Sequence, residues 1–429
     1  MVSGTIGTMG TGRRRRPLAA MPAAARVTAL TVVLVVASGV LAGCAQSTDR
    51  RLEQGVLEEV TEQPFYALPD PIPTGAPGEV VRTEQLESAP AGTVARRVMY
   101  HSTDVHGAPL LTSAVVIAPT APWAGGGPRP VVAWGHPTTG MAPRCAPSTG
   151  VDPFDLIEGM TDLLNAGYAV AAADYPGMGV AGPDSYLVGV TEGNAVLDAV
   201  RAAGHLDGTG VTAASDVLLW GHSQGGHAVL FAAQQAAGYA PELRLAAAAV
   251  AAPATELATL LDDDIGDVSG VSLGSYAFQT YQSVYGPTTP GLALTQVLTD
   301  DGAAATPQMA QLCLIGQNEQ LHAIAGPLVG RYLSHDPATT EPWASILRQN
   351  TPGGVPIRVP LFVAQGLADE LVHPAATEQF VQQQCGQGTH VVFKQVPGAG
   401  HGEIALDVVP DVLTFFAAAR AGTPPASTC

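Results

Sequence analysis

The sequence predicts an α/β fold with a mostly parallel central sheet flanked by helices. Apolar runs of strand length alternate with helical segments through most of the chain, which favours parallel β-α-β connections. One apolar run leads directly into a glycine-rich turn and a helix around Ser223. Over 100 residues separate the strand expected to end near Ala251 from the strand expected to begin at Val359. A gap of this length indicates an inserted, mainly helical cap domain.

The expected elements follow in chain order. Two strands flank the turn His106-Gly107 and form a hairpin, over residues 94–100 and 110–119. The alternating part contains strands at 130–134, 168–174, 216–220, 243–251, 359–365 and 390–395. The helices are expected at 154–166, at 191–203, directly after Gly226 and at 407–420.

The most specific pattern is Gly221-His222-Ser223-Gln224-Gly225, which follows an apolar run and precedes a segment with good helix propensity. A buried strand that breaks into Gly-x-Ser-x-Gly and opens a helix is typical of the nucleophile turn of α/β-hydrolases. The pentapeptide alone is weak evidence, because Gly270-Val-Ser272-Leu-Gly274 also matches it. That second match follows an acidic segment that is no core strand, so we assign it to the cap. The context predicts an α/β-hydrolase fold with Ser223 as nucleophile.

A serine nucleophile needs an imidazole to take its proton and a carboxylate to orient that imidazole. In this fold the acid and the histidine follow the serine along the chain, each on a loop after a strand. Asp369 follows one predicted strand, with the adjacent Glu370 as the weaker alternative. His401 lies in a glycine-rich loop after the last strand. His373 is only four residues beyond Asp369, and His390 begins a strand at its wrong end.

Ester hydrolysis also needs donors for the oxyanion of the tetrahedral intermediate. One is expected to be the backbone N–H of Gln224, directly after the nucleophile. The second is expected from a loop earlier in the chain, where Pro137 has no N–H and Thr138 is the better candidate. His136 and His222 are expected to form structural hydrogen bonds.

Several blocks between about Tyr100 and the carboxyl terminus are similar to one family. They are Trp134-Gly-His-Pro-Thr-Thr-Gly140 with Cys145-Ala-Pro-Ser148, Ala173-Asp-Tyr-Pro-Gly-Met-Gly179, Ser185-Tyr-Leu-Val-Gly189 and Gly221-His-Ser-Gln-Gly-Gly226. In these blocks the chain resembles the secretory lipase family, the capped α/β-hydrolases that include fungal lipase A. The resemblance implies esterase or lipase activity on acyl esters without a cofactor. Pro137 stands where the family usually has glycine, and no metal or phosphate-loop motif is found.

The amino terminus has the pattern of an export signal. Arginines at 13–16 precede a fourteen-residue apolar run, Val27–Val40, which is too short to span a bilayer comfortably. Leu41-Ala-Gly-Cys44 follows and resembles the lipobox of bacterial lipoproteins. That resemblance implies cleavage before Cys44, a diacylglyceryl group on its sulfur and anchoring at the outer face of the cell membrane. The alternatives are an ordinary secretory signal and an uncleaved anchor.

Charge and cysteine content set further bounds. Residues 44–429 carry 14 basic and 37 acidic side chains, a net charge of −23 that opposes binding to nucleic acid or anionic headgroups. The four cysteines after Cys44 suggest two disulfides with three possible pairings, or free buried thiols. The family resemblance favours Cys145–Cys313 and Cys385–Cys429.

The expected domain organisation has four parts. They are a signal peptide at 1–43, a tether and amino-terminal arm at 44–75, a hydrolase core at 76–253 and 351–429, and a cap at 254–350. The cap contains two apolar stretches, Leu273–Tyr285 and Met309–Ile324, the second expected to be helical. We expect both to form an acyl-binding groove. The alternative is that both stretches form the core of the cap.

These observations predict an exported serine ester hydrolase, a lipase that acts on acylglycerols or other fatty-acyl esters. A capped peptidase or acyltransferase is an alternative, because a fold does not fix a reaction. A non-catalytic lipoprotein that binds a lipid under its cap is a third hypothesis. The expected partners are a lipid or acyl-ester substrate and the membrane, without nucleic acid. The sequence does not predict the oligomeric state.

Overall fold

The computed structural model describes residues 64–150 and 152–429. The predicted signal peptide, Cys44 and most of the predicted tether lie outside these residues. Within the described ranges, no helix combines the length and the apolar character needed to cross a membrane.

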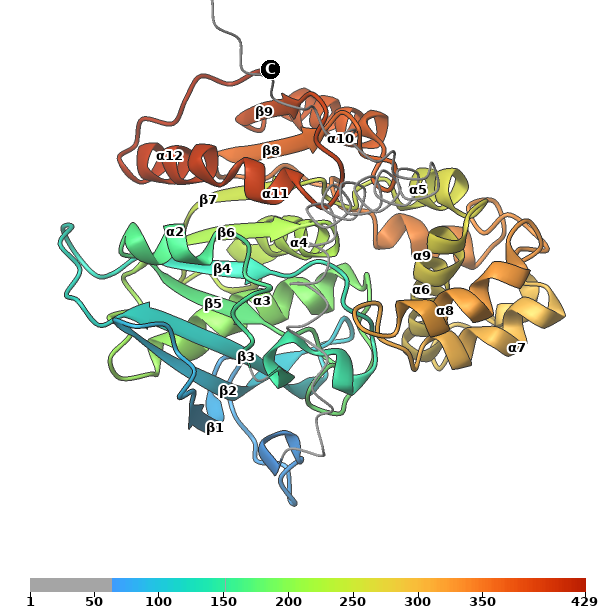
Figure 1. The fold of residues 1–429 in the computed structure, drawn as a ribbon, viewed down its shortest axis with the longest axis horizontal. Helices are drawn as coiled ribbons and strands as arrows, with labels where there is room; N and C mark the ends of the chain where they lie inside the picture. The colour runs from blue at the N-terminus through green and yellow to red at the C-terminus, as the bar shows by residue number, and fades with distance from the viewer. Residues whose placement is uncertain (1–63, 151) are drawn as a thin grey trace, which may run out of the picture. The chain divides into compact units, whose positions relative to one another are not determined.

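The described residues contain one nine-stranded sheet with the order β1-β2-β3-β5-β4-β6-β7-β8-β9 (Figure 1). The strands from β4 onwards pair in parallel, and β1 to β3 are antiparallel, including the pairing of β3 with β5. The bounds are β1 Val80–Gln85, β2 Thr93–Thr103, β3 Pro109–Pro119, β4 Val131–Gly135, β5 Ala169–Ala173, β6 Asp216–His222, β7 Arg244–Ala251, β8 Leu361–Gly366 and β9 Val391–Val396. The mostly parallel sheet and its hairpin are therefore as predicted.

Helices cover both faces of the sheet. One layer consists of α3 (Gly189–Gly204), α4 (Gln224–Tyr239) and α10 (Pro374–Gly386), and the other of α2 (Met160–Asn165), α11 (Ile404–Asp407) and α12 (Val409–Arg420). Each layer packs on alternate side chains of the buried strands and forms its own hydrophobic cluster. Both faces of a parallel sheet must be covered in this way, which explains why β4 to β8 are almost wholly apolar.

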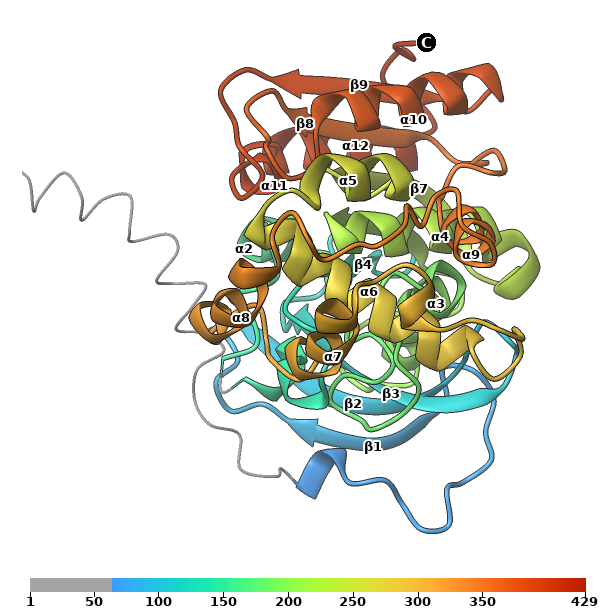
Figure 2. The same cartoon turned by 90° about the vertical axis from the view of Figure 1, so that its right-hand side faces the viewer.

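A group of helices lies between β7 and β8 in the chain and beside one end of the sheet (Figures 1 and 2). It comprises α5 (Leu257–Asp264), α6 (Val268–Tyr285), α7 (Asp300–Met309), α8 (Asn318–Ala325) and α9 (Trp343–Gln349). We refer to residues 254–350 as the cap. Its interior is a separate cluster around Tyr276, Phe278 and Trp343.

Two predicted helices differ from the structure. The helix expected from Phe154 is helical only from Met160, because Gly159 has a φ of +81° and adopts the left-handed conformation that interrupts a helix. The helical stretch expected over 309–324 is also interrupted. There, Gly316 has a φ of +87°, and Cys313 is joined to Cys145. In both cases the apolar pattern extends through a glycine whose backbone conformation interrupts the helix.

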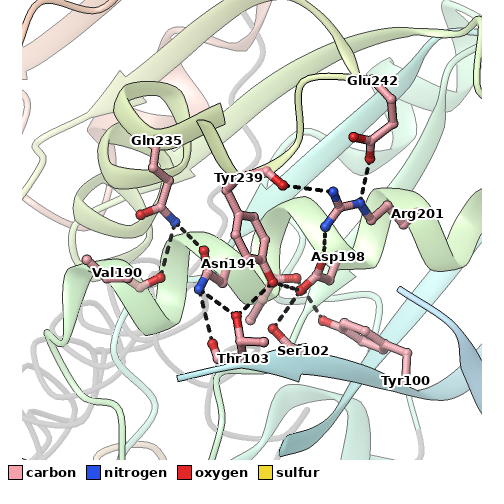
Figure 3. Close-up of polar contacts among 11 residues, drawn as sticks. Tyr100, Ser102, Thr103, Val190, Asn194, Asp198, Arg201, Gln235, Tyr239 and Glu242 are labelled. Atoms are coloured by element: carbon pink, nitrogen blue, oxygen red, sulfur yellow. Dashed lines mark hydrogen bonds and ion pairs between the residues drawn. The ribbon is translucent and has the colours of Figure 1, made fainter. Parts of the chain in front are cut away.

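A buried polar network joins α3 to β2 and α4 (Figure 3). The Asp198 carboxylate accepts hydrogen bonds from Ser102, Tyr239 and Arg201 at 2.6–2.7 Å. Arg201 also donates to Glu242 at 2.7 Å. Burial raises the pKa of Asp198 to about 6 despite these donors. Every group has a partner, so the network holds the layer in place on this side of the sheet.

Candidate active site

Ser223 lies in the turn between β6 and α4 with a φ of +58°, a strained value for a residue with a side chain. Its two flanking glycines are required by close backbone contacts. A Cβ on Gly221 would lie 2.3 Å from the carbonyl oxygen of Gly225, and one on Gly225 would lie 1.8 Å from that of Gly135. The strand, turn and helix therefore have the geometry of a nucleophile turn, at the carboxyl end of the parallel strands.

Three side chains from separate loops form a hydrogen-bonded chain. His401 Nε2 lies 3.0 Å from Ser223 Oγ, and His401 Nδ1 lies 2.8 Å from Asp369 Oδ2. The serine hydroxyl donates to Nε2, and Nδ1–H donates to the carboxylate, which is the neutral tautomer that a general base requires. The structure thus brings together the three residues that the sequence singled out.

Further donors fix Asp369 in this position. Its Oδ1 accepts from the backbone N–H groups of Leu371 and Val372, at 2.9 and 2.8 Å, and Gln365 Nε2 lies 3.2 Å from Oδ2. Burial would raise the pKa of Asp369, but the hydrogen bond from His401 and the two backbone N–H groups lower it below its usual value. The carboxylate is therefore ionised while it orients the imidazole.

A second imidazole lies directly behind His401. The rings of His222 and His401 are 4.9 Å apart, and His222 Nδ1 is 3.0 Å from Glu158 Oε2. Burial would lower the pKa of His222, but the Glu158 carboxylate raises it above its usual value. Burial lowers the pKa of His401, and the charge of His222 acts in the same direction. His222 thus forms a structural pair, as expected, and it also affects the charge of its neighbour.

The side chain of Gln224, the residue after the nucleophile, is fixed by a hydrogen-bond network. Gln224 is the first residue of α4, where backbone N–H groups have no partner within the helix. Its Nε2 donates to Glu192 Oε1 at 2.6 Å, and His227 Nδ1 donates to Glu192 Oε2 at 3.1 Å. His227 Nε2 lies 2.8 Å from the carbonyl oxygen of Asn350, a residue of the cap. This network links the helix of the nucleophile turn to the cap.

Thr138 and Tyr186 face the serine from the other side. Their hydroxyls are 3.2 Å apart, and both residues line the same cavity as Ser223 and Gln224. His136 is turned away from this cavity wall: it stacks on Tyr175 at 4.3 Å, and its Nδ1 lies 2.7 Å from the carbonyl oxygen of Pro137. Burial lowers the pKa of His136 to about 4. His136 therefore has the structural environment that the sequence predicted.

The competing candidates lie elsewhere. Glu370 is exposed. His373 lies 3.8 Å from Asp264, and His390 contacts the carbonyl oxygen of Pro425. Ser272 is buried within α6, where its hydroxyl donates to the carbonyl of Val268. None of these four has a place in the chain of hydrogen bonds at Ser223.

A cavity of about 770 Å³, including its open mouth, begins at Ser223 and extends under the cap. Its lining is mostly apolar and comes largely from α5 and α6, including Leu257, Leu260, Leu273, Phe278 and Tyr281. The expected contribution of Leu273–Tyr285 is therefore present. The expected contribution of 309–324 is absent, because Met309 and Leu321 are buried in the core of the cap. The contribution of α5 to this lining was not predicted, because the acidic residues at the end of the helix obscure its apolar pattern.

The cysteine pairs match those implied by the family resemblance. Cys145 is joined to Cys313, and Cys385 is joined to Cys429. The first connects the loop that carries Thr138 to the cap, and the second connects α10 to the carboxyl terminus.

The sequence profile of the secretory lipase family matches residues 154–428. The chain belongs to the secretory lipase family. It is 27% identical to a lipase A of Moesziomyces aphidis over 93% of this chain and 88% of that one. It is 24% identical to a protein of Mycobacterium tuberculosis named a probable inactive lipase, over 85% and 83% of the two chains. It is also 24% identical to a trichothecene C-3 esterase of Fusarium sporotrichioides, over 80% of each.

Solved structures show the same fold. Candida antarctica lipase A in its closed state superimposes with a TM-score of 0.73 at 22% identity, over 87% of this chain and 89% of that one. A cell-wall-degrading esterase of Xanthomonas oryzae gives a TM-score of 0.64 at 22% identity, over 81% and 98%. This member of the secretory lipase family is thus an α/β-hydrolase of the lipase and esterase class, and the family and the two disulfides indicate an exported protein.

Proposed function

We propose that this protein is a serine ester hydrolase, a lipase that cleaves acylglycerols or other fatty-acyl esters through an acyl-enzyme on Ser223. The observation that carries the proposal is the chain from Asp369 through His401 to Ser223, which opens on a mostly apolar cavity. An acyl chain gains about 0.8 kcal/mol for each CH₂ that leaves water. The cavity therefore supplies binding energy at the place where the serine can attack.

The proposed reaction follows from the hydrogen bonds. His401 Nε2 takes the proton of Ser223 as the serine oxygen attacks the carbonyl carbon of the ester. The backbone N–H of Gln224 and a donor from Thr138 stabilise the resulting oxyanion. His401 then gives its proton to the alcohol oxygen as the ester bond breaks. Water, activated by the same imidazole, releases the fatty acid and restores the serine.

A panel of p-nitrophenyl esters from acetate to palmitate tests the reaction and its substrate class. We expect hydrolysis of the whole panel, a gain in rate once a long-chain ester exceeds its solubility limit, and loss of all activity in Ser223→Ala. Labelling by a fluorophosphonate is expected at Ser223. Ester hydrolysis that survives in folded Ser223→Ala, or labelling at another serine, would overturn the assignment.

The same panel, extended with p-nitroanilides and with added alcohols, separates the alternatives. A peptidase would cleave anilides faster than esters, and an acyltransferase would pass the acyl group to an added alcohol in preference to water. A non-catalytic lipid-binding protein would hydrolyse nothing. This alternative is tested because one relative is named a probable inactive lipase. The hydrogen-bonded chain at Ser223 supports the catalytic alternative here.

We further propose that the exported protein is anchored to the outer face of the bacterial membrane by a lipid on Cys44. The support is the sequence Leu41-Ala-Gly-Cys44 after an apolar run. Two or three acyl chains provide the anchoring that a single chain does not. Partition of the native protein into detergent and the intact mass of its mature amino terminus test this. An unmodified amino terminus beyond Cys44 would exclude the anchor.

A further inference from the structure

The cavity that begins at Ser223 has one ionisable carboxyl in its mostly apolar wall. Asp264, the last residue of α5, is the only charged side chain among the described residues that line this cavity. Its neighbours on the wall include Leu260, Leu261 and Leu371. The residue is 8% exposed, and the proposed mechanism does not use it. A carboxylate is costly in such surroundings unless donors compensate it.

Compensation of the Asp264 carboxylate is weak. No hydrogen bond to its oxygens is present within the described part of the chain, and His373 Nε2 lies 3.8 Å from Oδ1, beyond hydrogen-bond distance. Asp264 also lies at the carboxyl end of a helix, where the negative end of the helix dipole disfavours a carboxylate. By contrast, Asp369 has three hydrogen-bond donors besides His401 nitrogen. The two buried carboxyls of this region are therefore held in very different ways.

Negative charges face Asp264 from each side. Asp263 lies on the same helix, Asp267 at the start of α6, and Asp369 on the loop after β8. Burial raises the pKa of Asp264 to about 7, and these three carboxylates act in the same direction. The helix α9 contributes the apolar Leu347 to the wall. The carboxyl therefore changes its charge near neutral pH, beside the space that a chain would fill.

We propose that Asp264 is a specificity-determining residue whose protonation controls how well the cavity accepts a long acyl chain. The neutral carboxyl can lie against CH₂ groups at modest cost. The carboxylate keeps water beside it, and a chain that displaces this water leaves the charge unsolvated. Long chains therefore bind the form with neutral Asp264, whereas an acetyl group does not reach it. This inference rests on the proposed ester hydrolase function.

The test compares two esters across pH. The ratio of kcat/KM for p-nitrophenyl decanoate to that for p-nitrophenyl acetate cancels the titration of His401, which both reactions share. Between about pH 6 and about pH 8, we expect this ratio to fall up to about tenfold in the wild type, following the neutral fraction of Asp264. In Asp264→Asn the ratio should stay high across the range. Asp262→Asn is the matched control, since Asp262 is exposed on the same helix and does not line the cavity.

A binding measurement keeps the proposal separate from catalysis. Calorimetric titration of 1-decanol into Ser223→Ala uses a ligand without charge at any of these pH values. Its affinity should weaken with rising pH in Ser223→Ala and stay constant when Asp264→Asn is added. A ratio and an affinity that are flat with pH, or that fall equally in both backgrounds, would overturn the role of Asp264. Failure of the function itself would appear differently, as absence of acetate hydrolysis.

Discussion

Two histidines near Ser223 have carboxylate partners at almost the same distance, and their second nitrogens determine their chemistry. His401 lies 2.8 Å from Asp369, and its Nε2 faces the hydroxyl of Ser223 at 3.0 Å. His227 lies 3.1 Å from Glu192, and its Nε2 faces the carbonyl oxygen of Asn350 at 2.8 Å. A hydroxyl can donate a proton, whereas a carbonyl oxygen can only accept a hydrogen bond.

The consequence is a difference in the ability of each imidazole to transfer a proton. His401 has an acceptor on one side and a donor on the other, so it is a neutral imidazole with a lone pair available to Ser223. His227 Nδ1 faces the Glu192 carboxylate and its Nε2 faces the carbonyl oxygen of Asn350, so neither partner offers a proton for transfer. The first pair is suited to move a proton, and the second to connect α4 with the cap. A carboxylate beside a histidine is thus insufficient to indicate catalysis.

The largest expected effect distinguishes the two pairs kinetically. His401→Ala should lower kcat for ester hydrolysis by about a millionfold, and Asp369→Asn by about ten-thousandfold, because the proton acceptor or its orientation is lost. Steady-state kinetics on p-nitrophenyl acetate measure both losses. Residual activity within tenfold of the wild type in folded His401→Ala would contradict the assignment of the base.

The second prediction concerns stability. His227→Ala removes one hydrogen-bond partner of the wholly buried Glu192 carboxylate, and a hydrogen bond to a charged group typically contributes about 1.5–3 kcal/mol. Urea unfolding should show this loss, and kcat of the folded fraction should fall far less than in His401→Ala. His390→Ala, at a half-buried position distant in sequence from the site, is the control. An unchanged free energy of unfolding in His227→Ala would show that the pair has no structural weight.

The smallest expected effect concerns the third pair, Glu158 with His222. Neutral His401 is the active form, and its lowered pKa puts the acid limb of kcat/KM below the usual histidine value near 6.5. His222→Asn removes a positive charge from behind the ring, so the pKa of His401 should rise. The acid limb should then move to higher pH.

The pH profile of acetate hydrolysis measures this shift. His373→Asn serves as control, because that ring lies beside Asp264 and has no contact with His401. A limb that stays in place in His222→Asn, or that moves downward, would contradict the electrostatic role of His222.

The errors in the sequence analysis have a common cause. Apolar periodicity predicted helices at 154–166 and 309–324, but Gly159 and Gly316 adopt positive φ values there. The edge strand β1 was missed, because its residues are half-buried or exposed and carry no apolar run. Apolar periodicity identifies segments whose own side chains are buried. It fails where the backbone conformation depends on tertiary contacts.

The sequence by itself determined the nucleophile turn, the chain order of Ser223, Asp369 and His401, and the position of the cap. These features follow from local rules: glycines where no side chain fits, and apolar runs that must be buried. Only the tertiary structure decided what Glu192 and Asp264 face, since nothing in their local sequence separates them from other helical acids. The charge and hydrogen bonding of a buried carboxyl depend on groups distant in sequence, which only folding brings together.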